Sequence, residues 1–450
     1  MFHDLPRYSD TTSNFFWSSR IPSHWRVQPG LAVLQENRRK NHGLIESQVL
    51  SLSYGRVVVK PVEKQRGLVP ESYEGYQVLD PGDIVVRPTD LQNDQTSIRV
   101  GHVKHLGIIT SAYIGLRPTG DWSDAYAFQY LTVVDSSKRI YGMGSGLRQQ
   151  LSWSDLKRMP CLVPPPEDQA AIVKYLAHAN ARIDKAIAAK RRLVSLLDEQ
   201  KTAQIAAVFA GGGGKDAPFI PLKRLVRVMG GMTPSKENAA FWGGDIPWVS
   251  PKDVKTDVLD GSLDCITQTA LDGTNISFVP RGSVVIVVRG MILARTVPVA
   301  TLNVDSTINQ DIKAMVPCEG VITSEYLRDW LSAHEAELIQ LVETAGHGTK
   351  KLDTERLMNV RVSLPPVAVQ EELSRRAGAE SSATSAAVQR VRDEVALLQE
   401  FRMRLVADVV TGQVDVRAIA ATLPDGPESI DVAFVGLDDD LEEALVGSEE

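Results

Sequence analysis

Two long segments of the chain repeat apolar residues at alternating steps of four and three. They run from about Glu167 to Ala210 and from about Val367 to Thr411. The first stripe comprises Ile172, Leu176, Ala179, Ile183, Ala186, Leu193 and Leu197, with Lys190 on the same seam. The second comprises Val388, Val391, Val395, Leu398, Leu405 and Val409, with Arg402 interrupting it. Stripes this narrow are typical of coiled-coil helices.

The ends of both segments carry helix signals. Pro166 stands where a first-turn proline is tolerated, and Gly211 and Gly412 stand where helices stop. At 1.5 Å per residue such a helix is roughly 66 Å long and needs a partner, for which the other segment is the nearest candidate. The stretch "RRAGAESSATS" is small and polar, so we expect the second helix to pack closely or to fray there.

The two helical segments belong to a longer internal repeat. An offset of 201 residues places Leu151 on Leu352, Gln169 on Gln370, and the pair "PP" at 164–165 on "PP" at 365–366. A match that holds register over some sixty residues predicts two copies of one unit. In each copy a globular part precedes the helix.

The globular parts, at about 21–163 and 219–364, consist of short β-branched runs punctuated by Gly and Pro. This pattern predicts mostly β structure with a few helices, one of them in "SEYLRDWLSAHEAELIQLVE". Outside the shared strands "GDIVVR" and "GSVVIVVR" the two parts do not align well by sequence. The Gly-rich "GGGGKDAP" after the first helix is expected to be a flexible linker.

The predicted fold class is α+β. It has two mixed, β-rich domains joined by two long antiparallel α-helices that form a coiled coil, with a pseudo-twofold internal repeat. The predicted boundaries are 1–163, 164–211, 212–364, 365–412 and an acidic C-terminal tail at 413–450. Twofold proteins commonly meet DNA at two half-sites. On the repeat alone, a coiled-coil scaffold with two protein-binding heads is an equally good interpretation.

Composition is that of a soluble globular protein, with 43% hydrophobic and 23% charged residues and no membrane-length apolar run. The three cysteines are far apart and fit neither a disulfide framework nor a zinc site, which favours a cytoplasmic location. The net charge is −7, but residues 421–450 carry ten Asp or Glu and no Lys or Arg. The remainder therefore has a charge of +3, which is compatible with DNA binding.

Several phrases, in this order, carry a resemblance to a known family: "IPSHWRV", "LDPGDIVVRPTDLQN", "GSGLRQQLSWSDLKRMPCLVPPPEDQAAIVKYL", "GGMTPSKENAAFWGGDIPWVSPKDV", "STINQDIKAMVP" and "GTKKLDTERLMNVRVSLPPVAVQEEL". Together they span about 21–417 and resemble the specificity subunit of type I restriction–modification systems. The acidic extension after residue 417 lies outside this resemblance.

The resemblance implies two target-recognition domains that recognise a bipartite, asymmetric site in double-stranded DNA. It implies two modification subunits, which supply adenine methylation with S-adenosylmethionine, and two ATP-dependent restriction subunits. The chain itself would be non-catalytic and would bind no cofactor, with S-adenosylmethionine, ATP and Mg expected on the partners, and no membrane is involved.

The residues agree with an absence of catalysis. "LVPPPED" and "SLPPVAV" contain prolines without the preceding Asn/Asp and following aromatic residue of an amino-methyltransferase loop. "GGGGKDAP" lacks the first glycine and the Ser/Thr of a phosphate-binding loop. The eight histidines show no metal-ligand spacing.

Candidate DNA contacts follow from side-chain chemistry, because Arg pairs with guanine and Asn or Gln with adenine, while Lys, Ser and Thr more often hold phosphates. In the first globular part the candidates are Arg87, Thr89, Gln92, Asn93, Gln95 and Arg99. In the second they are Lys236, Asn238, Arg289, Arg295, Asn309 and Gln310. Phosphate contacts are expected from Arg148, Lys350 and Lys351, at repeat-equivalent glycine turns. Each also has a plain structural interpretation, as a polar loop residue satisfied by solvent or a neighbour.

Overall fold

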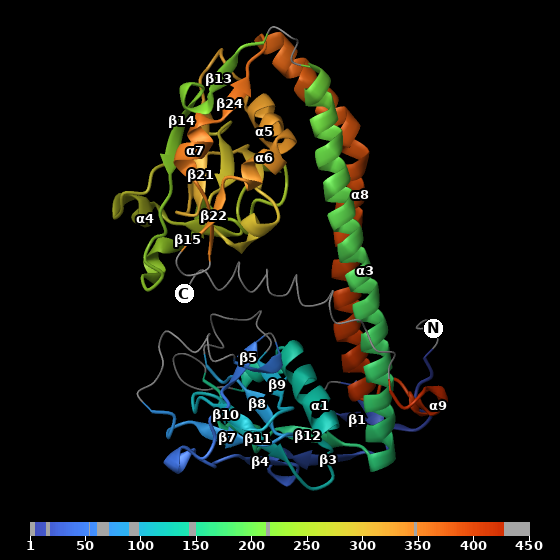
Figure 1. The fold of residues 1–450 in the computed structure, drawn as a ribbon. Helices are drawn as coiled ribbons and strands as arrows, with labels where there is room; N and C mark the ends of the chain where they lie inside the picture. Colours follow the sequence, from blue (N-terminus) through green and yellow to red (C-terminus); the bar gives the residue numbers. More distant parts are fainter. Residues whose placement is uncertain are drawn as a thin grey trace. The chain divides into compact units, whose positions relative to one another are not determined.

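The computed structural model describes residues 5–14, 19–53, 55–60, 72–89, 99–143, 150–212, 217–345 and 349–426 (Figure 1). The described residues form two compact units. The first comprises residues up to 187 together with those from 396 onward, and the second comprises 188–395. Compactness divides the chain within the long helices, so the domain boundaries expected from the sequence stay predictions.

The first unit is built on a six-stranded sheet of order β4-β11-β8-β9-β6-β5. The strands are β4 (Leu34–Glu36), β11 (Ile114–Pro118), β8 (Ile84–Val86), β9 (Val100–His102), β6 (Arg56–Val59) and β5 (Leu50–Ser53). Helix α1 (Asp124–Ser136) packs against β9 and β11 and buries Tyr126, Tyr130 and Leu131. The buried β-branched residues of β8 make it the central strand of this core.

The smaller elements of the first unit surround this sheet. They are β1 (Thr11–Asn14), β2 (Ser19–Pro22), β3 (Arg26–Pro29), β7 (Gln77–Leu79), β10 (Gly107–Ile109), α2 (Trp153–Leu156), β12 (Pro160–Val163) and α9 (Arg417–Thr422). Strand pairs β1–β2, β7–β10 and β3–β12 are antiparallel.

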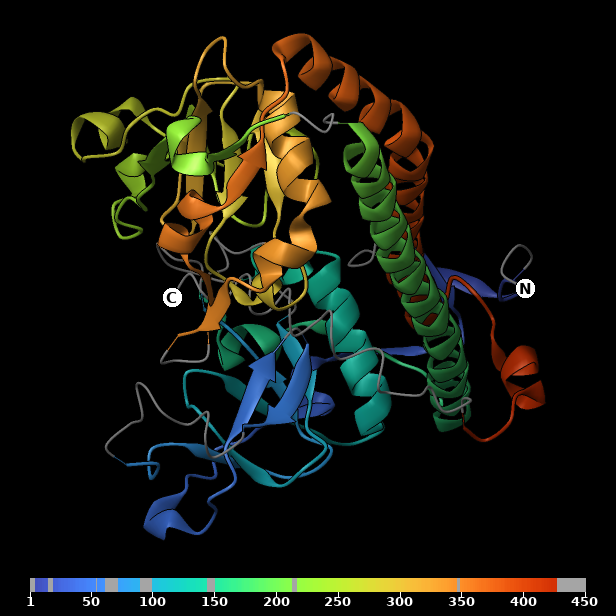
Figure 2. The same cartoon turned by 45° about the horizontal axis from the view of Figure 1, so that its top comes forward.

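The second unit is built on a five-stranded sheet of order β14-β21-β18-β19-β16. The strands are β14 (Val226–Gly230), β21 (Ile312–Pro317), β18 (Val284–Val287), β19 (Val299–Leu302) and β16 (Val258–Leu259). Helix α5 (Ser324–Ala333) packs on β18 and β19 and contributes Tyr326, Leu327 and Trp330 to the core. Figure 2 shows the same fold from a second direction. A three-stranded sheet, β17-β15-β20, lies beside it in the same unit.

The remaining elements of the second unit are β13 (Phe219–Pro221), β15 (Trp242–Val249), β17 (Asp264–Ile266), α4 (Gln268–Asp272), β20 (Thr307–Ile308), α6 (Glu335–Ile339), β22 (Val342–Thr344), β23 (Lys350–Leu352), α7 (Thr354–Asn359) and β24 (Arg361–Ser363). The helix predicted in "SEYLRDWLSAHEAELIQLVE" is present but interrupted at His334, and its last residues enter β22. The sequence pattern did not show this break.

The two globular parts share one topology, although their sequences do not align. The order β4-β11-β8-β9-β6 in the first unit matches β14-β21-β18-β19-β16 in the second. The unusual parallel pair at the end also recurs, as β6 with β9 and β16 with β19. A buried strand requires only apolar, β-branched side chains, so its individual residues can change while the strand order stays the same.

Strand pairing also sets the true register between the shared strands. Ile84 pairs with Leu116, and Val284 with Met315, so Val284 is the counterpart of Ile84. Arg87 therefore corresponds to Val287, and Arg289 lies two residues further along the chain. The letters "VVR" that end both shared strands are therefore not structurally equivalent, and they differ in register by two residues.

The repeated Pro-Pro…Gln phrase forms the same hydrogen-bonded junction in each unit. In the second unit the Gln370 amide accepts a hydrogen bond from the Thr323 N–H at 3.0 Å and donates to the carbonyls of Val321 and Pro365 at 2.9 and 2.8 Å. In the first unit Gln169 accepts from the Ser123 N–H at 2.9 Å and donates to the Asp121 and Pro164 carbonyls. Both Gln side chains are buried. The phrase is repeated because it joins the start of each long helix to the N-cap of the helix that packs on the sheet of the same unit, α1 or α5.

The two predicted long helices are α3 (Pro166–Gly212) and α8 (Val367–Val410), and within each unit they lie side by side (Figures 1 and 2). Contacts in the second unit run in opposite directions along the two helices: Lys190 with Glu394, Asp198 with Arg392, and Gln204 with Thr384. In the first unit Asp184 contacts Arg402. The helices are therefore antiparallel, as the sequence predicted.

The helix seam is less apolar in its middle than the sequence pattern indicated. Leu193, placed on the seam by its spacing, is 44% exposed. The charged residues that interrupt the stripes, Lys190 and Arg402, each meet a carboxylate of the other helix. Such half-exposed ion pairs add little stability, but they define which residues face each other.

The small polar stretch of α8 packs closely and does not fray. Ser381 and Thr384 are buried, the Ser381 hydroxyl donates to the Ala377 carbonyl at 2.7 Å, and Thr384 donates to Gln204 of α3 at 3.0 Å. Short side chains let α3 approach α8 here, because a bulky residue would hold the two helices apart.

Candidate nucleic-acid interface

The end of strand β18 in the second unit leads into an irregular loop of residues 288–298, the β18–β19 loop. Gly290 has a φ of +136°, a conformation that a side chain would disfavour. Leu293 is buried beneath the loop, while Arg289 and Arg295 are exposed. Arg289 and Arg295, which the sequence suggested as DNA contacts, thus lie exposed in the loop that follows a central strand.

Strand β23 borders this loop and carries both predicted phosphate-binding lysines. The Gly290 N–H donates to the Lys350 carbonyl at 3.0 Å, and Arg289 forms a β-bridge with Lys351. The Lys350 ammonium donates to the Thr344 hydroxyl at 2.9 Å, and Lys351 is exposed. We name Arg289, Arg295, Lys350 and Lys351 the basic edge of the second unit.

A third segment, after strand β20, reaches the same region. The Val288 N–H donates to the Asp311 carbonyl at 2.8 Å, and the Asp311 carboxylate lies 3.9 Å from the Arg289 guanidinium. Gln310 is exposed and accepts a hydrogen bond from the Thr233 hydroxyl at 2.5 Å. Sequence reasoning identified Gln310 but missed Thr233 and Asp311, whose roles depend on contacts with distant segments.

Two predicted residues of the second unit have structural roles. Asn309 is buried, and its side-chain oxygen accepts from the Asp311 N–H at 3.0 Å, so it shapes the turn and is not available to a base. Asn238 is exposed but caps the short 3-10 turn of Ala239–Phe241 by accepting from the Ala240 N–H at 3.1 Å. Lys236 is exposed in the same loop.

In the first unit, Gln92, Asn93, Gln95 and Arg148 lie outside the described residues. Arg87 and Thr89 are half-buried at the end of β8. Arg99 is 0% exposed, and its guanidinium donates to the Thr89 carbonyl at 2.5 Å. A side chain without accessible surface cannot contact a base, so the structure argues against the predicted role of Arg99.

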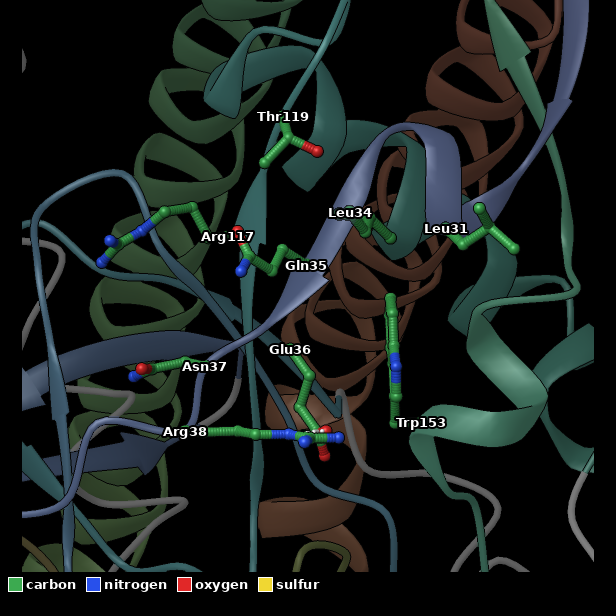
Figure 3. A pocket seen from close by; sticks show the side chains of 9 residues that line it. All are labelled: Leu31, Leu34, Gln35, Glu36, Asn37, Arg38, Arg117, Thr119 and Trp153. Carbon is green, nitrogen blue, oxygen red and sulfur yellow. Dashed lines mark hydrogen bonds and ion pairs between the residues drawn. The ribbon is translucent and has the colours of Figure 1, made fainter.

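Trp25 and Trp248 are buried packing residues. Trp153 instead lines a hollow of about 630 Å³ in the first unit, which sequence reasoning did not anticipate (Figure 3). The other lining residues are Leu31, Leu34, Gln35, Glu36, Asn37, Arg38, Arg117 and Thr119.

The arginines of this hollow already have carboxylate partners. Arg38 donates to Glu36 at 2.9 Å, as Figure 3 shows, and Arg117 donates to Asp83 at 2.8 Å and to Asp80 at 2.6 Å. The hydrogen bond to Asp83 raises the pKa of the Arg117 guanidinium, with burial opposing it. Nearby carboxylates therefore offset the charge of both arginines, and one of these carboxylates, Glu36, itself lines the hollow.

The described residues show no group of three or more His, Cys, Asp or Glu able to hold a metal ion. Burial raises the pKa of the Cys161 thiol far above its usual value, so this cysteine has no thiolate character. In the part of the chain that the structure describes, no helix is long and apolar enough to cross a membrane.

These features define a class of protein: a tandem α+β repeat on paired antiparallel helices, with an exposed basic edge beside a central strand of the second unit. Residues 215–376 match the family described as "Type I restriction modification DNA specificity domain". Residues 215–376 are therefore similar to a type I restriction–modification specificity domain, and the basic edge lies within this segment.

Curated relatives agree with this domain. The chain is 27% identical over 256 residues to the "Type I restriction enzyme EcoR124I/EcoR124II specificity subunit" of Escherichia coli, covering 55% of this chain and 61% of the relative. It is 33% identical over 117 residues to the "Type I restriction enzyme MjaIX specificity subunit" of Methanocaldococcus jannaschii, covering 25% of this chain and 26% of that relative. The chain thus matches about three fifths and one quarter of their lengths. These matches confirm the resemblance predicted from the sequence motifs.

The comparison with solved structures gave matches of low TM-score. One, described as "Structural basis underlying complex assembly and conformational transition of the type I R-M system", has a TM-score of 0.49 and 16% identity, covering 88% of this chain and 100% of that chain. The HsdS subunit from Thermoanaerobacter tengcongensis has a TM-score of 0.39 and 15% identity, covering 88% and 99%.

Proposed function

We propose that this chain is the non-catalytic DNA-recognition subunit of a type I restriction–modification complex. Each globular part recognises one half of a bipartite, asymmetric site in double-stranded DNA. The observation that carries the proposal is the basic edge, which lies inside the segment that matches a DNA specificity domain. Exposed Arg and Lys side chains beside a rigid strand are suited to base and phosphate contacts.

The shared strand order supports a second recognition domain in the first unit. Its loops differ from those of the second unit in both length and residues, so the two halves of the DNA site are expected to differ. The antiparallel helices, whose cross-helix ion pairs define their register in each unit, are proposed to set the spacer between the halves.

The partners follow from the same assignment. Two modification subunits would dock on the helices and methylate adenine with S-adenosylmethionine, and two restriction subunits would use ATP and Mg. This chain is proposed to bind none of these cofactors itself and to act in the cytoplasm. The observed relation to proteins named as specificity subunits supports these roles.

Two alternatives make different predictions. A coiled-coil scaffold with two protein-binding heads would show no salt-dependent preference for one duplex over random DNA. A solitary methyltransferase would bind S-adenosylmethionine as an isolated chain, which the absence of an Asn/Asp-Pro-Pro-aromatic sequence argues against.

The decisive experiment is methylome sequencing of a host with and without this chain. The expected result is a split, non-palindromic motif containing methylated adenine, which disappears when the chain is deleted. Persistence of an unchanged split motif in the deletion strain would reject the proposal. Exchange of residues 218–364 with those of a relative should alter only one half of the motif.

The lysines of the basic edge provide a quantitative test. In the double variant Lys350→Ala/Lys351→Ala, affinity should fall to a similar extent for target and random duplexes, because phosphate contacts carry no sequence information. The log–log salt dependence of binding should lose about 2 in slope, since each phosphate contact contributes about 0.9. Lys255→Ala, an exposed lysine of the same unit, is the control and should leave the slope unchanged. An unchanged slope in the double variant would remove these lysines from the interface.

A further inference from the structure

In each unit a carboxylate side chain accepts a hydrogen bond from the end of the loop that follows the central strand. The carboxylate comes from α1 in the first unit and from α6, directly after α5, in the second. In the second unit the carboxylate is Glu335, the first residue of α6. It accepts a hydrogen bond from the Val297 N–H at 2.9 Å and another from the Thr296 hydroxyl. Thr296 and Val297 stand at the end of the β18–β19 loop, just before strand β19 begins. The same loop carries Arg289 and Arg295.

The corresponding carboxylate of the first unit is Asp135, near the end of α1. It accepts a hydrogen bond from the buried Arg99 N–H at 2.7 Å. Arg99 in turn donates from its side chain to the Thr89 carbonyl, which links the two sides of the loop base. Arg99 thus connects the two ends of the loop by hydrogen bonds within the unit. This role explains why a residue predicted to contact DNA is buried.

The two carboxylates are equivalent in the repeat. Ser123 caps α1 as Thr323 caps α5, and the same spacing of 200 residues places Asp135 on Glu335. Arg99 and Pro298 are also equivalent, because their carbonyls accept from Arg87 and Val287 respectively. Proline has no N–H, so in the second unit the bond is made by the preceding residue, Val297. The same contact is therefore maintained despite different local sequences.

We infer that Glu335 and Asp135 are positioning residues that fix the base of the loop in their own unit and thereby set its sequence specificity. The inference rests on the proposed DNA-recognition function. The strand ladder ends at Val287 and Pro298, so beyond it the loop depends on contacts such as this one. A recognition side chain displaced at its base loses the geometry that a bidentate base contact requires, while phosphate attraction is preserved.

The role predicts a particular pattern among variants. Glu335→Ala removes the acceptor and should reduce discrimination between target and mismatched bases about tenfold, in one half of the site only. Glu335→Gln retains an acceptor oxygen and should behave almost as the unmodified chain does. Asp135→Ala should relax the other half. Glu337→Ala, an exposed carboxylate of the same helix, is the matched control.

The experiment measures the methylated motif in a host that expresses each variant with its natural partners, together with the thermal stability of the full chain. Relaxation of one half with retention of the other, rescued by Glu335→Gln, is the expected result. An unchanged motif for Glu335→Ala, or equal weakening at all sequences, would overturn the inference. If Glu335→Ala fails to fold, Thr296→Val removes one of the two hydrogen bonds with little change in volume, and an unchanged motif in that variant would be equally negative. Absence of a split motif with the unmodified chain would instead reject the proposed function.

Discussion

Gln370→Ala is expected to lower the free energy of unfolding of the second unit by about 2–4 kcal/mol. The substitution removes three hydrogen bonds of a fully buried side chain. The Thr323 N–H and the carbonyls of Val321 and Pro365 then lose the Gln370 amide as their partner. Each hydrogen bond of this kind contributes a net of about 0.5–1.5 kcal/mol, so three together account for about 2–4 kcal/mol. Urea unfolding followed by circular dichroism would measure the effect.

The matched control is Gln389→Ala on the same helix. Gln389 is exposed and makes a single hydrogen bond to Asp393 four residues away, so its loss should change stability by no more than about 0.5 kcal/mol. Gln169→Ala should destabilise the first unit as Gln370→Ala does the second. Equal stabilities of Gln370→Ala and Gln389→Ala would show that the junction contributes nothing.

Gly231→Ala is expected to destabilise the second unit by about 3 kcal/mol and to reduce recognition of its half-site. A Cβ atom there would lie 2.0 Å from the Ile308 carbonyl oxygen and 2.3 Å from that of Asn309. Both are backbone atoms, so either the loop after β14 or the segment after β20 must move. That movement would separate Thr233 from Gln310, which now share a hydrogen bond.

Thermal unfolding and binding to target and random duplexes would measure both effects of Gly231→Ala. Gly261→Ala is the control, because its Cβ would meet no atom within 4 Å. The control should leave both stability and discrimination within error of the unmodified chain. A Gly231→Ala protein as stable as the control would show that the segment relaxes without cost.

Much of the architecture was predictable because it depends on periodic patterns. The 3.5-residue stripes identified α3 and α8 to within two residues at each end, and the 201-residue offset identified the repeat. The common strand order was not predictable. Corresponding strands share only their apolar character, and the loops between them differ in length.

The residues of the candidate site were predictable only in part, because residue type is local information and burial is not. Arg289, Arg295, Lys350 and Lys351 were identified from residue type and local turn signals, and the structure brings them to one edge. Arg99 and Asn309 have the same chemistry but are buried. Residue type indicates what a side chain can bind, whereas burial depends on distant segments.

The sequence by itself determined the two helices, the tandem repeat, the resemblance to specificity subunits and the chemistry available for DNA contacts. These features depend on local periodicity, fixed spacing and residue identity, which a linear sequence contains directly. Only the tertiary structure decided which polar residues are accessible, which seam charges pair across the helices, and that Glu335 and Asp135 occupy equivalent positions. Those features arise from contacts between residues that are tens to hundreds of positions apart, and no local pattern specifies such contacts.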